Sequence, residues 1–298
     1  KTVTISKVDA TCPTLTAYSA AYDGSAHGIG VSGGSGGTIQ YRTSTSGSWS
    51  NTKPTITNVS DSPITTYVQV AGDGNHNTKD CGSKTVTISK KTLTCPSAPA
   101  DKTYSGKAQA SGIACPSGSS AGGDTTKTNA SDSYAQTCTP DNNHQFASTC
   151  SVTWKIKAKA VTVTAGSTTR DWNGSALTNS TCTASGLISG HTVACTMTDA
   201  STITLAGTAA NTINTVTIKD ASSNTVTGNY SVTKAAGTLK VNVATPTVTL
   251  QAKTANYTGS AIAANSATVS PNSNPTITYK YYTNDTCTTG ETTTAPSA

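Results

Sequence analysis

Short segments of this chain place hydrophobic residues at every second position. In residues 151–157, Val152, Trp154 and Ile156 point to one side and polar residues fill the positions between them. This alternation is typical of a half-buried antiparallel strand. The same pattern recurs at Val86 and Ile88, at Val161 and Val163, at Leu239, Val241 and Val243, and at Val248 and Leu250. No segment carries an apolar period of 3.6 residues long enough to predict a helix.

A five-residue motif occurs four times along the chain, at intervals of about 70–85 residues, which indicates a tandem array of small domains. The motif is an aromatic residue, a free position, Gly, a small or basic residue and Ala. Its aromatic and glycine positions are Tyr22 and Gly24, Tyr104 and Gly106, Trp172 and Gly174, and Tyr257 and Gly259. Turn-forming residues precede each glycine, so we predict a tight turn with positive φ and a largely buried aromatic ring.

The repeat divides the chain into modules. Residues 1–7 nearly duplicate residues 84–90, which predicts that they are the closing strand of a preceding repeat. The ranges that follow are repeat 1 (8–90), repeat 2 (91–157), repeat 3 (158–242) and an incomplete repeat 4 (243–298). Linkers are short and lack Gly-rich or Pro-rich spacers, which favours a semi-rigid rod. The predicted fold is all-β, a tandem array of small Ig-like β-sandwich modules, with β-grasp-like repeats as the alternative.

Composition supports strands and excludes two classes of function. Charged residues make up 11% of the chain, well below the roughly 25% of ordinary domains. The net charge of +6 is carried by scattered lysines, with no basic run interleaved with aromatics, so we expect no nucleic-acid partner. No apolar run approaches the ~20 residues of a membrane-spanning helix.

The nine cysteines predict disulfides, because no CxxC pair or Cys–His cluster suggests a metal site. Cys12 and Cys95 both lie in Thr-Cys-Pro segments, and Cys81 and Cys150 both precede closing strands. The predicted pairs are Cys12–Cys81, Cys95–Cys150, Cys115–Cys138 and Cys182–Cys195, with Cys287 left unpaired. Disulfides mark an extracellular location and stabilise modules whose cores are small.

No candidate catalytic or cofactor-binding group emerges from the remaining polar residues. His76 and His144 occupy a position that is Tyr230 in repeat 3, which indicates a packing role for a flat ring with a polar tip. Calcium sites need several carboxylates, and this chain is acid-poor. We therefore expect no enzyme activity, no cofactor and no metal.

The repeated motif and three segments of repeat 3 resemble the bacterial extracellular repeats called MBG or YDG domains. The segments are residues 185–190, 228–232 and 236–241. The resemblance implies a β-rich, Ig-like module that spaces or displays something else, and it brings no catalytic residues. The cysteines are not part of the family pattern.

The function expected from these features is that of a structural or adhesive surface protein. The chain would be a disulfide-stapled segment of an extracellular stalk or fibre, with neighbouring repeats or copies of itself as partners, and host or cell-surface glycans or proteins as further ones. The alternative is an array of carbohydrate-binding modules. Its stacking rings would be Tyr41, Trp49, Tyr279, Tyr281 and Tyr282, although Tyr279 and Tyr281 alternate and are expected to face a core.

Overall fold

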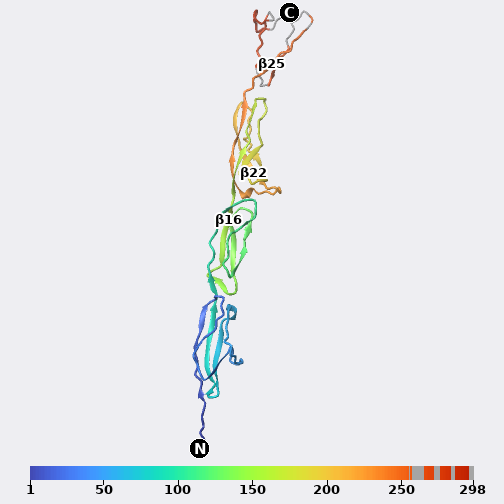
Figure 1. Cartoon of the computed structure of the whole chain (residues 1–298). Coiled ribbons are helices and arrows are strands. Elements are labelled where there is room, and N and C mark those ends of the chain that lie inside the picture. Colours follow the sequence, from blue (N-terminus) through green and yellow to red (C-terminus); the bar gives the residue numbers. More distant parts are fainter. Residues whose placement is uncertain (255, 257–264, 272–275, 283–285, 295–298) are drawn as a thin grey trace. The chain divides into compact units, whose positions relative to one another are not determined.

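The structure is a computed structural model that describes residues 1–254, 256, 265–271, 276–282 and 286–294. Its regular elements are β-strands, with two short 3-10 turns, η1 (Val59–Asp61) and η2 (Thr227–Asn229), and no α-helix among the described residues (Figure 1). The prediction of an all-β chain of small sandwich modules is confirmed, and no helix packs on a described sheet as the β-grasp alternative requires. The chain divides into two compact units, Lys1–Lys157 and Ala158–Ala298. The finer boundaries of the four repeats stay predictions.

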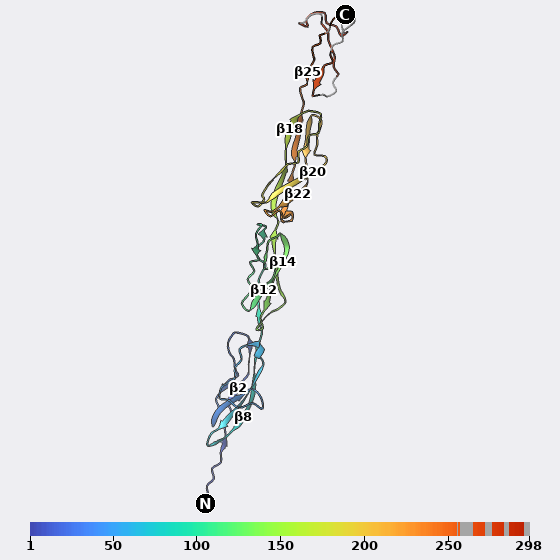
Figure 2. The ribbon, with the colours of Figure 1, turned by 90° about the vertical axis from the view of Figure 1, so that its right-hand side faces the viewer.

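Repeat 1 contains a four-stranded sheet in the order β3-β8-β6-β5, with the smaller pairs β2-β4 and β1-β7. Its strands are β1 (Val8–Asp9), β2 (Thr14–Thr16), β3 (Tyr18–Ala21), β4 (Gly30–Ser32), β5 (Gly37–Arg42), β6 (Ile64–Gly72), β7 (His76–Asn77) and β8 (Lys79–Ser89). Figure 2 labels β2 and β8 within this module.

Repeat 2 belongs to the same unit and repeats this plan. Its main sheet has the order β10-β16-β14-β12, beside the pairs β15-β9 and β11-β13. The strands are β9 (Lys91–Leu93), β10 (Lys102–Thr103), β11 (Gln109–Ala110), β12 (Ser119–Gly123), β13 (Thr126–Lys127), β14 (Ser131–Pro140), β15 (His144–Phe146) and β16 (Cys150–Lys157).

The second unit holds repeat 3 and the described part of repeat 4. Repeat 3 has two three-stranded sheets, β19-β17-β23 and β18-β24-β21, and the pair β20-β22, while β25 and β26 pair in repeat 4. The strands are β17 (Lys159–Ala165), β18 (Thr168–Asp171), β19 (Cys182–Ser185), β20 (Thr192–Met197), β21 (Gly207–Asn211), β22 (Ile213–Lys219), β23 (Tyr230–Ala235), β24 (Gly237–Asn242), β25 (Thr247–Thr249) and β26 (Thr268–Ser270).

The closing strand of each of repeats 1–3 pairs differently on its two edges. β8, β16 and β24 are antiparallel to β6, β14 and β21, as the sequence predicts. On the other edge they run parallel to an opening strand, β3, β10 or β18. The opening strand is interrupted in each of these repeats, and its earlier part pairs elsewhere, as β1 does with β7, β9 with β15 and β17 with β23. Pro13 and Pro96 lie in the interrupted segments of repeats 1 and 2 and donate no hydrogen bond to a ladder, whereas the break in repeat 3 contains no proline.

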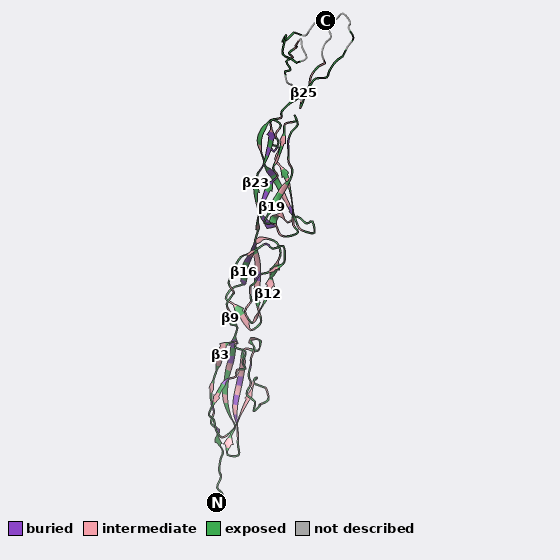
Figure 3. Cartoon of the chain, turned by 45° about the horizontal axis from the view of Figure 1, so that its top comes forward, coloured by how far each residue is buried: buried purple, intermediate pink, exposed green. Residues whose placement is uncertain are grey.

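The alternation predicted for the closing strands describes the cores correctly in repeats 1–3 (Figure 3). Val86 and Ile88, then Val152, Trp154 and Ile156, and then Leu239 and Val241 are all at most 6% exposed. Burying one such side chain stabilises a module by about 1.5–3 kcal/mol.

Two expectations about strands were wrong. Val243 does not continue the pattern, because β24 ends at Asn242 and Val243 is 82% exposed. Val248 and Leu250 are also exposed, and Leu250 lies beyond β25. Residues 1–7 form no strand in this structure, and their assignment as the closing strand of a preceding repeat stays a prediction.

Candidate functional site

Four disulfides lie within the modules. They join Cys12 to Cys81, Cys95 to Cys150, Cys115 to Cys138 and Cys182 to Cys195, the same pairs that the sequence predicts, with Cα–Cα distances of 5.4–6.3 Å. The first two link the start of a module to its closing strand. Cys287 is exposed and forms no disulfide with a described residue.

The repeated motif forms the same turn in repeats 1–3. Gly24, Gly106 and Gly174 have φ of +83°, +74° and +82°, where a side chain is strained. The residue before each glycine accepts a hydrogen bond from the backbone N–H two positions later, from Ser25 to Asp23 (2.8 Å), from Lys107 to Ser105 (3.4 Å) and from Ser175 to Asn173 (3.1 Å). Tyr257 and Gly259, the fourth copy, lie outside the described residues.

The aromatic residues of this motif differ in burial, although the sequence predicts large burial in every repeat. Tyr104 is buried, whereas Tyr22 and Trp172 are half-buried. Trp172 packs at the edge of the cluster of Leu177, Leu239 and Val241. Tyr22 packs against the core cluster of repeat 1, and its ring also contacts His144 of the next repeat.

That contact is made by residues 141–144 of repeat 2, which we call the 141–144 turn. Asp141 Oδ1 accepts hydrogen bonds from the N–H of Asn143 (2.9 Å) and from Nδ1 of His144 (2.6 Å). The carbonyl of Asn143 accepts from the N–H of Lys91 (3.0 Å), at the start of β9. The imidazole lies against Gly118, where an added Cβ would come within 2.4 Å of the ring. The turn is thus fixed from within repeat 2.

The side chains of the 141–144 turn reach repeat 1 at three points. Oδ1 of Asn143 accepts from the N–H of Val59 (2.9 Å), and Nδ2 of Asn143 donates to Oδ1 of Asn58 (3.0 Å). The His144 ring meets Tyr22 edge-on, with 5.3 Å between centroids and an interplanar angle of 81°. One amide side chain therefore satisfies a backbone donor of the neighbouring module while a ring pair packs beside it.

The electrostatics of this turn favour an ionised Asp141. Its hydrogen bond with His144 holds the pKa of the Asp141 carboxyl below its usual range. Partial burial opposes this effect, and the hydrogen bond from the N–H of Asn143 adds to it. Asp73 has an equivalent environment in repeat 1, and its pKa is lowered first by His76 and then by the N–H of Asn75. Both carboxylates are exposed to solvent, so we expect their ionisation to affect the stability of their own turns rather than that of the whole module.

We expect the 141–144 turn to loosen in acid. A carboxyl whose pKa is lowered on folding stabilises the fold above its unfolded pKa, about 3.9 for Asp, and this stabilisation is lost as the pH falls through the lower folded value. Hydrogen-exchange protection of the Asn143 N–H should therefore be steady near neutrality and decline below about pH 4. Asp141→Ala should remove this decline, whereas Asp199→Ala, an exposed change in the other unit, should keep it. A decline that persists in Asp141→Ala would contradict the expectation.

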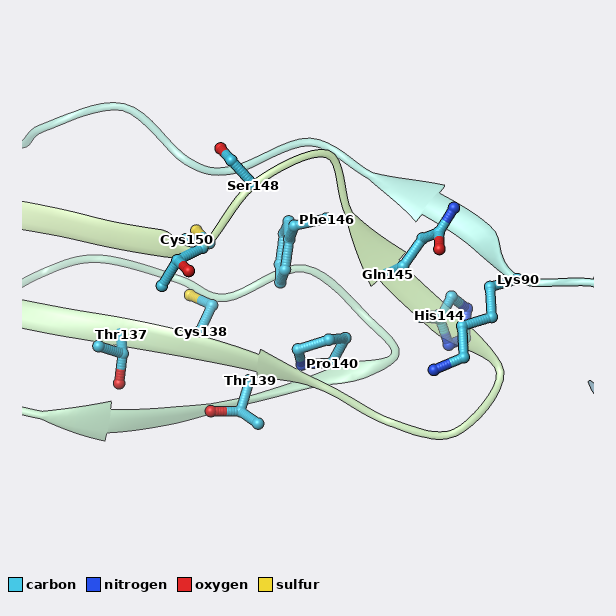
Figure 4. Close-up of a pocket in the computed structure, with 11 residues that line it drawn as sticks. Lys90, Thr137, Cys138, Thr139, Pro140, His144, Gln145, Phe146, Ser148 and Cys150 are labelled. Carbon is cyan, nitrogen blue, oxygen red and sulfur yellow. The ribbon is translucent and has the colours of Figure 1, made fainter.

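A hollow of about 420 Å³ lies beside the 141–144 turn (Figure 4). Phe146 and Pro140 face one another across it, and Cys138 and Cys150 lie at one end. The remaining lining residues are Lys90, Thr137, Thr139, His144, Gln145, Ser148 and Thr149. Nδ1 of His144 is hydrogen-bonded to Asp141, which does not itself line the hollow.

The rings proposed for carbohydrate binding fall into two groups in different units. The Arg42 guanidinium lies 4.2 Å from the centroid of the Trp49 ring and covers one of its faces. Tyr279 and Tyr281 are half-buried and stack on one another, with 6.4 Å between centroids. Tyr41 and Tyr282 are also half-buried. Tyr41 and Trp49 belong to the first unit, and Tyr279, Tyr281 and Tyr282 belong to the second.

Among the described residues, no three His, Cys, Asp or Glu side chains cluster as metal ligands. Within the same residues, no helix has the length and apolar character needed to cross a membrane.

No protein-family model matches the chain, and no curated protein matches it. Among solved structures, the chain is similar to tandem Ig-domain proteins. They are the N-terminal four Ig domains of Dscam1 isoform 8.4 (8% identity, 78% of this chain and 72% of that one, TM-score 0.20), those of isoform 6.9 (8%, 79% and 73%, 0.19), and Sidekick-1 immunoglobulin domains 1–4 (13%, 81% and 75%, 0.17). TM-scores this low carry no information about relationship or function.

The sequence identifies Tyr22 as a motif residue but does not predict its contact with the 141–144 turn. Asn143 and Tyr22 lie far apart in the sequence, and neither type is unusual in so polar a chain. Gly118 supports the His144 ring only because of backbone geometry. One signal was present, namely the matching spacing of Asp, Asn and His in residues 73–76 and 141–144.

Proposed function

We propose that this chain is part of an extracellular structural or adhesive protein, a disulfide-stapled stalk or fibre whose modules hold one another end to end. The observation that carries the proposal is the contact of the 141–144 turn with repeat 1. Asn143 hydrogen-bonds to Asn58 and Val59, and His144 packs on Tyr22, so one module completes the polar contacts of the next.

The chemistry of the chain supports the same proposal. Four disulfides in modules this small favour an oxidising, extracellular compartment. The turn motif resembles that of MBG or YDG repeats, which favours a bacterial surface adhesin or haemagglutinin-like protein. The proposed role is non-catalytic. Its partners would be neighbouring repeats or copies of the chain, and then host or cell-surface glycans or proteins.

The carbohydrate-binding alternative has less support. The Trp49 ring is partly covered by Arg42, and the Tyr279 and Tyr281 rings stack on one another. Sugar binding by aromatic platforms needs an exposed ring face.

Asn143→Ala tests whether the contact holds the modules. Site-specific spin labels that do not use cysteine can be placed on Thr87 and Thr153, which are exposed on β8 and β16. We expect a narrow distance distribution in the native chain and one about twofold broader in Asn143→Ala, because the variant loses two hydrogen bonds worth about 0.5–1.5 kcal/mol each.

Asn142→Ala is the matched control, because Asn142 is an exposed residue of the same turn. It should leave the distribution narrow. Equal widths in the two variants would refute a holding role for the contact, and with it the proposed function.

A further inference from the structure

Repeat 1 carries a second copy of the 141–144 turn, at residues 73–76. Asp73 Oδ1 accepts from the N–H of Asn75 (2.8 Å) and from Nδ1 of His76 (2.7 Å), as Asp141 does in repeat 2. The N–H of Val8 donates to the carbonyl of Asn75 (3.2 Å), as Lys91 does to Asn143. An added Cβ at Gly36 would come within 2.7 Å of the His76 ring. The two turns therefore have the same construction.

The two turns differ in what covers them. The His144 side chain is 12% exposed and Asn143 is half-buried, because repeat 1 packs on them. The His76 side chain is 31% exposed, and Asn75 is exposed. The groups that bind a neighbouring module in repeat 2 are thus accessible in repeat 1.

The segment that enters this second turn has a matching copy as well. Residues 1–6 repeat residues 84–89, the end of β8, and both segments continue into a lysine. Val86 and Ile88 are 0% and 3% exposed in the core of repeat 1, whereas their counterparts Val3 and Ile5 are 85% and 92% exposed. Nζ of Lys7 donates to the carbonyl of Asp73 (3.1 Å), which holds the segment at the turn.

We propose that residues 1–7 and the 73–76 turn form one docking surface, and that its occupant is the body of a further module of this repeat type. Residues 1–7 would enter as its closing strand, with Val3 and Ile5 in its core. Asn75 would bind an exposed backbone N–H at the end of that body, as Asn143 binds Val59, and His76 would pack on the aromatic ring of its Tyr-x-Gly turn. The inference rests on the proposed function and identifies the partner that the same type of contact takes.

The choice of occupant follows from the chemistry of the two parts. Val3 and Ile5 lie on one face of the segment, so burying both requires a module core that lacks one strand. An exposed sheet edge alone does not supply such a core. The turn needs a backbone donor and an aromatic ring within reach of the end of that same strand. In unit 1, the body of repeat 1 supplies all of these to residues 84–90 and to the 141–144 turn.

The test joins an added copy of residues 8–83 to the front of Lys1 in the full chain. This copy contains its own Cys12–Cys81 pair, whose formation reports that it has folded. Hydrogen exchange is then measured on residues 2–6, with residues 85–89 of the same molecule as the internal standard. We expect residues 2–6 to gain at least about 100-fold protection over the native chain and to approach the standard.

Variants in the extended chain show whether residues 2–6 form a core strand of the added copy or associate with it only loosely. Val3→Asp with Ile5→Asp should abolish the new protection and leave residues 85–89 unchanged. Thr4→Asp is the control, because its counterpart Thr87 is exposed, and it should keep the protection. Carbethoxylation of His76, with both histidines of the added copy (the counterparts of His27 and His76) replaced by Gln, should fall to the level of His144.

Two results would overturn the proposal. One is unprotected residues 2–6 in an extended chain whose added disulfide has formed. The other is equal protection in the native chain at the same concentration, which would mean that the segment pairs with the sheet edge of another molecule. Neither result touches the contact between repeats 1 and 2, so the Asn143→Ala experiment decides the proposed function separately.

Discussion

Replacing Cys95 and Cys150 together by serine should lower the free energy of unfolding of repeat 2 by about 2–4 kcal/mol. The bridge spans 55 residues of a short module, so its loss releases much conformational freedom in the unfolded chain. Cys150 is also 2% exposed, and a serine hydroxyl there would need a hydrogen-bond partner. Denaturant unfolding followed by Trp154 fluorescence, with Trp49 and Trp172 replaced by Phe, measures the effect.

The matched control removes the bridge of repeat 3. Cys182→Ser with Cys195→Ser should leave the Trp154 transition within about 0.5 kcal/mol, because distant sites contribute independently. An unchanged Trp154 transition in the Cys95 and Cys150 variant would show that repeat 2 does not depend on this bridge.

Trp154→Ala should destabilise repeat 2 by about 3–5 kcal/mol, the largest effect expected from one substitution in this chain. The indole is 3% exposed, its centroid lies 5.1 Å from that of Tyr134, and its Nε1–H donates to the carbonyl of Asp124 (2.7 Å). Alanine would leave a cavity and an unpaired carbonyl.

Trp154→Phe separates these two causes, because it keeps a ring and loses the hydrogen bond. It should cost clearly less than alanine. Hydrogen exchange of β14 and β16 measures both variants without tryptophan fluorescence. Equal losses of protection would show that the hydrogen bond, rather than the packed ring, accounts for the stability.

The all-β fold could be predicted because its signal is local. Val152, Trp154 and Ile156 alternate over one strand, and burying their side of the strand fixes which way each faces. The same alternation predicts that the strand at Leu239 and Val241 continues to Val243, but Val243 is exposed. Alternation alone does not show where a ladder ends, since that depends on whether a partner strand continues.

The parallel pairing of first and last strands could not be predicted in the same way. Side chains alternate with a period of two in parallel and antiparallel ladders alike. The sequence pattern therefore does not show that Tyr18 lies opposite Val86 in a parallel ladder. The contact between repeats 1 and 2 was hidden for a related reason. Asn143 meets Val59 across 84 residues, and each is ordinary in its own segment.

The Cys12–Cys81 bridge keeps a tensile load off the parallel pairing of β3 with β8 in repeat 1. When opposite ends of two neighbouring parallel strands are pulled apart, their hydrogen bonds are loaded together in shear, whereas a hairpin opened from its free end breaks its bonds one after another. The Cys12–Cys81 bridge adds a covalent path across the module, from the break after β1 directly into β8. Residues 13–80 are then bypassed by the force, so the module can lengthen only through the short segments outside the bridge.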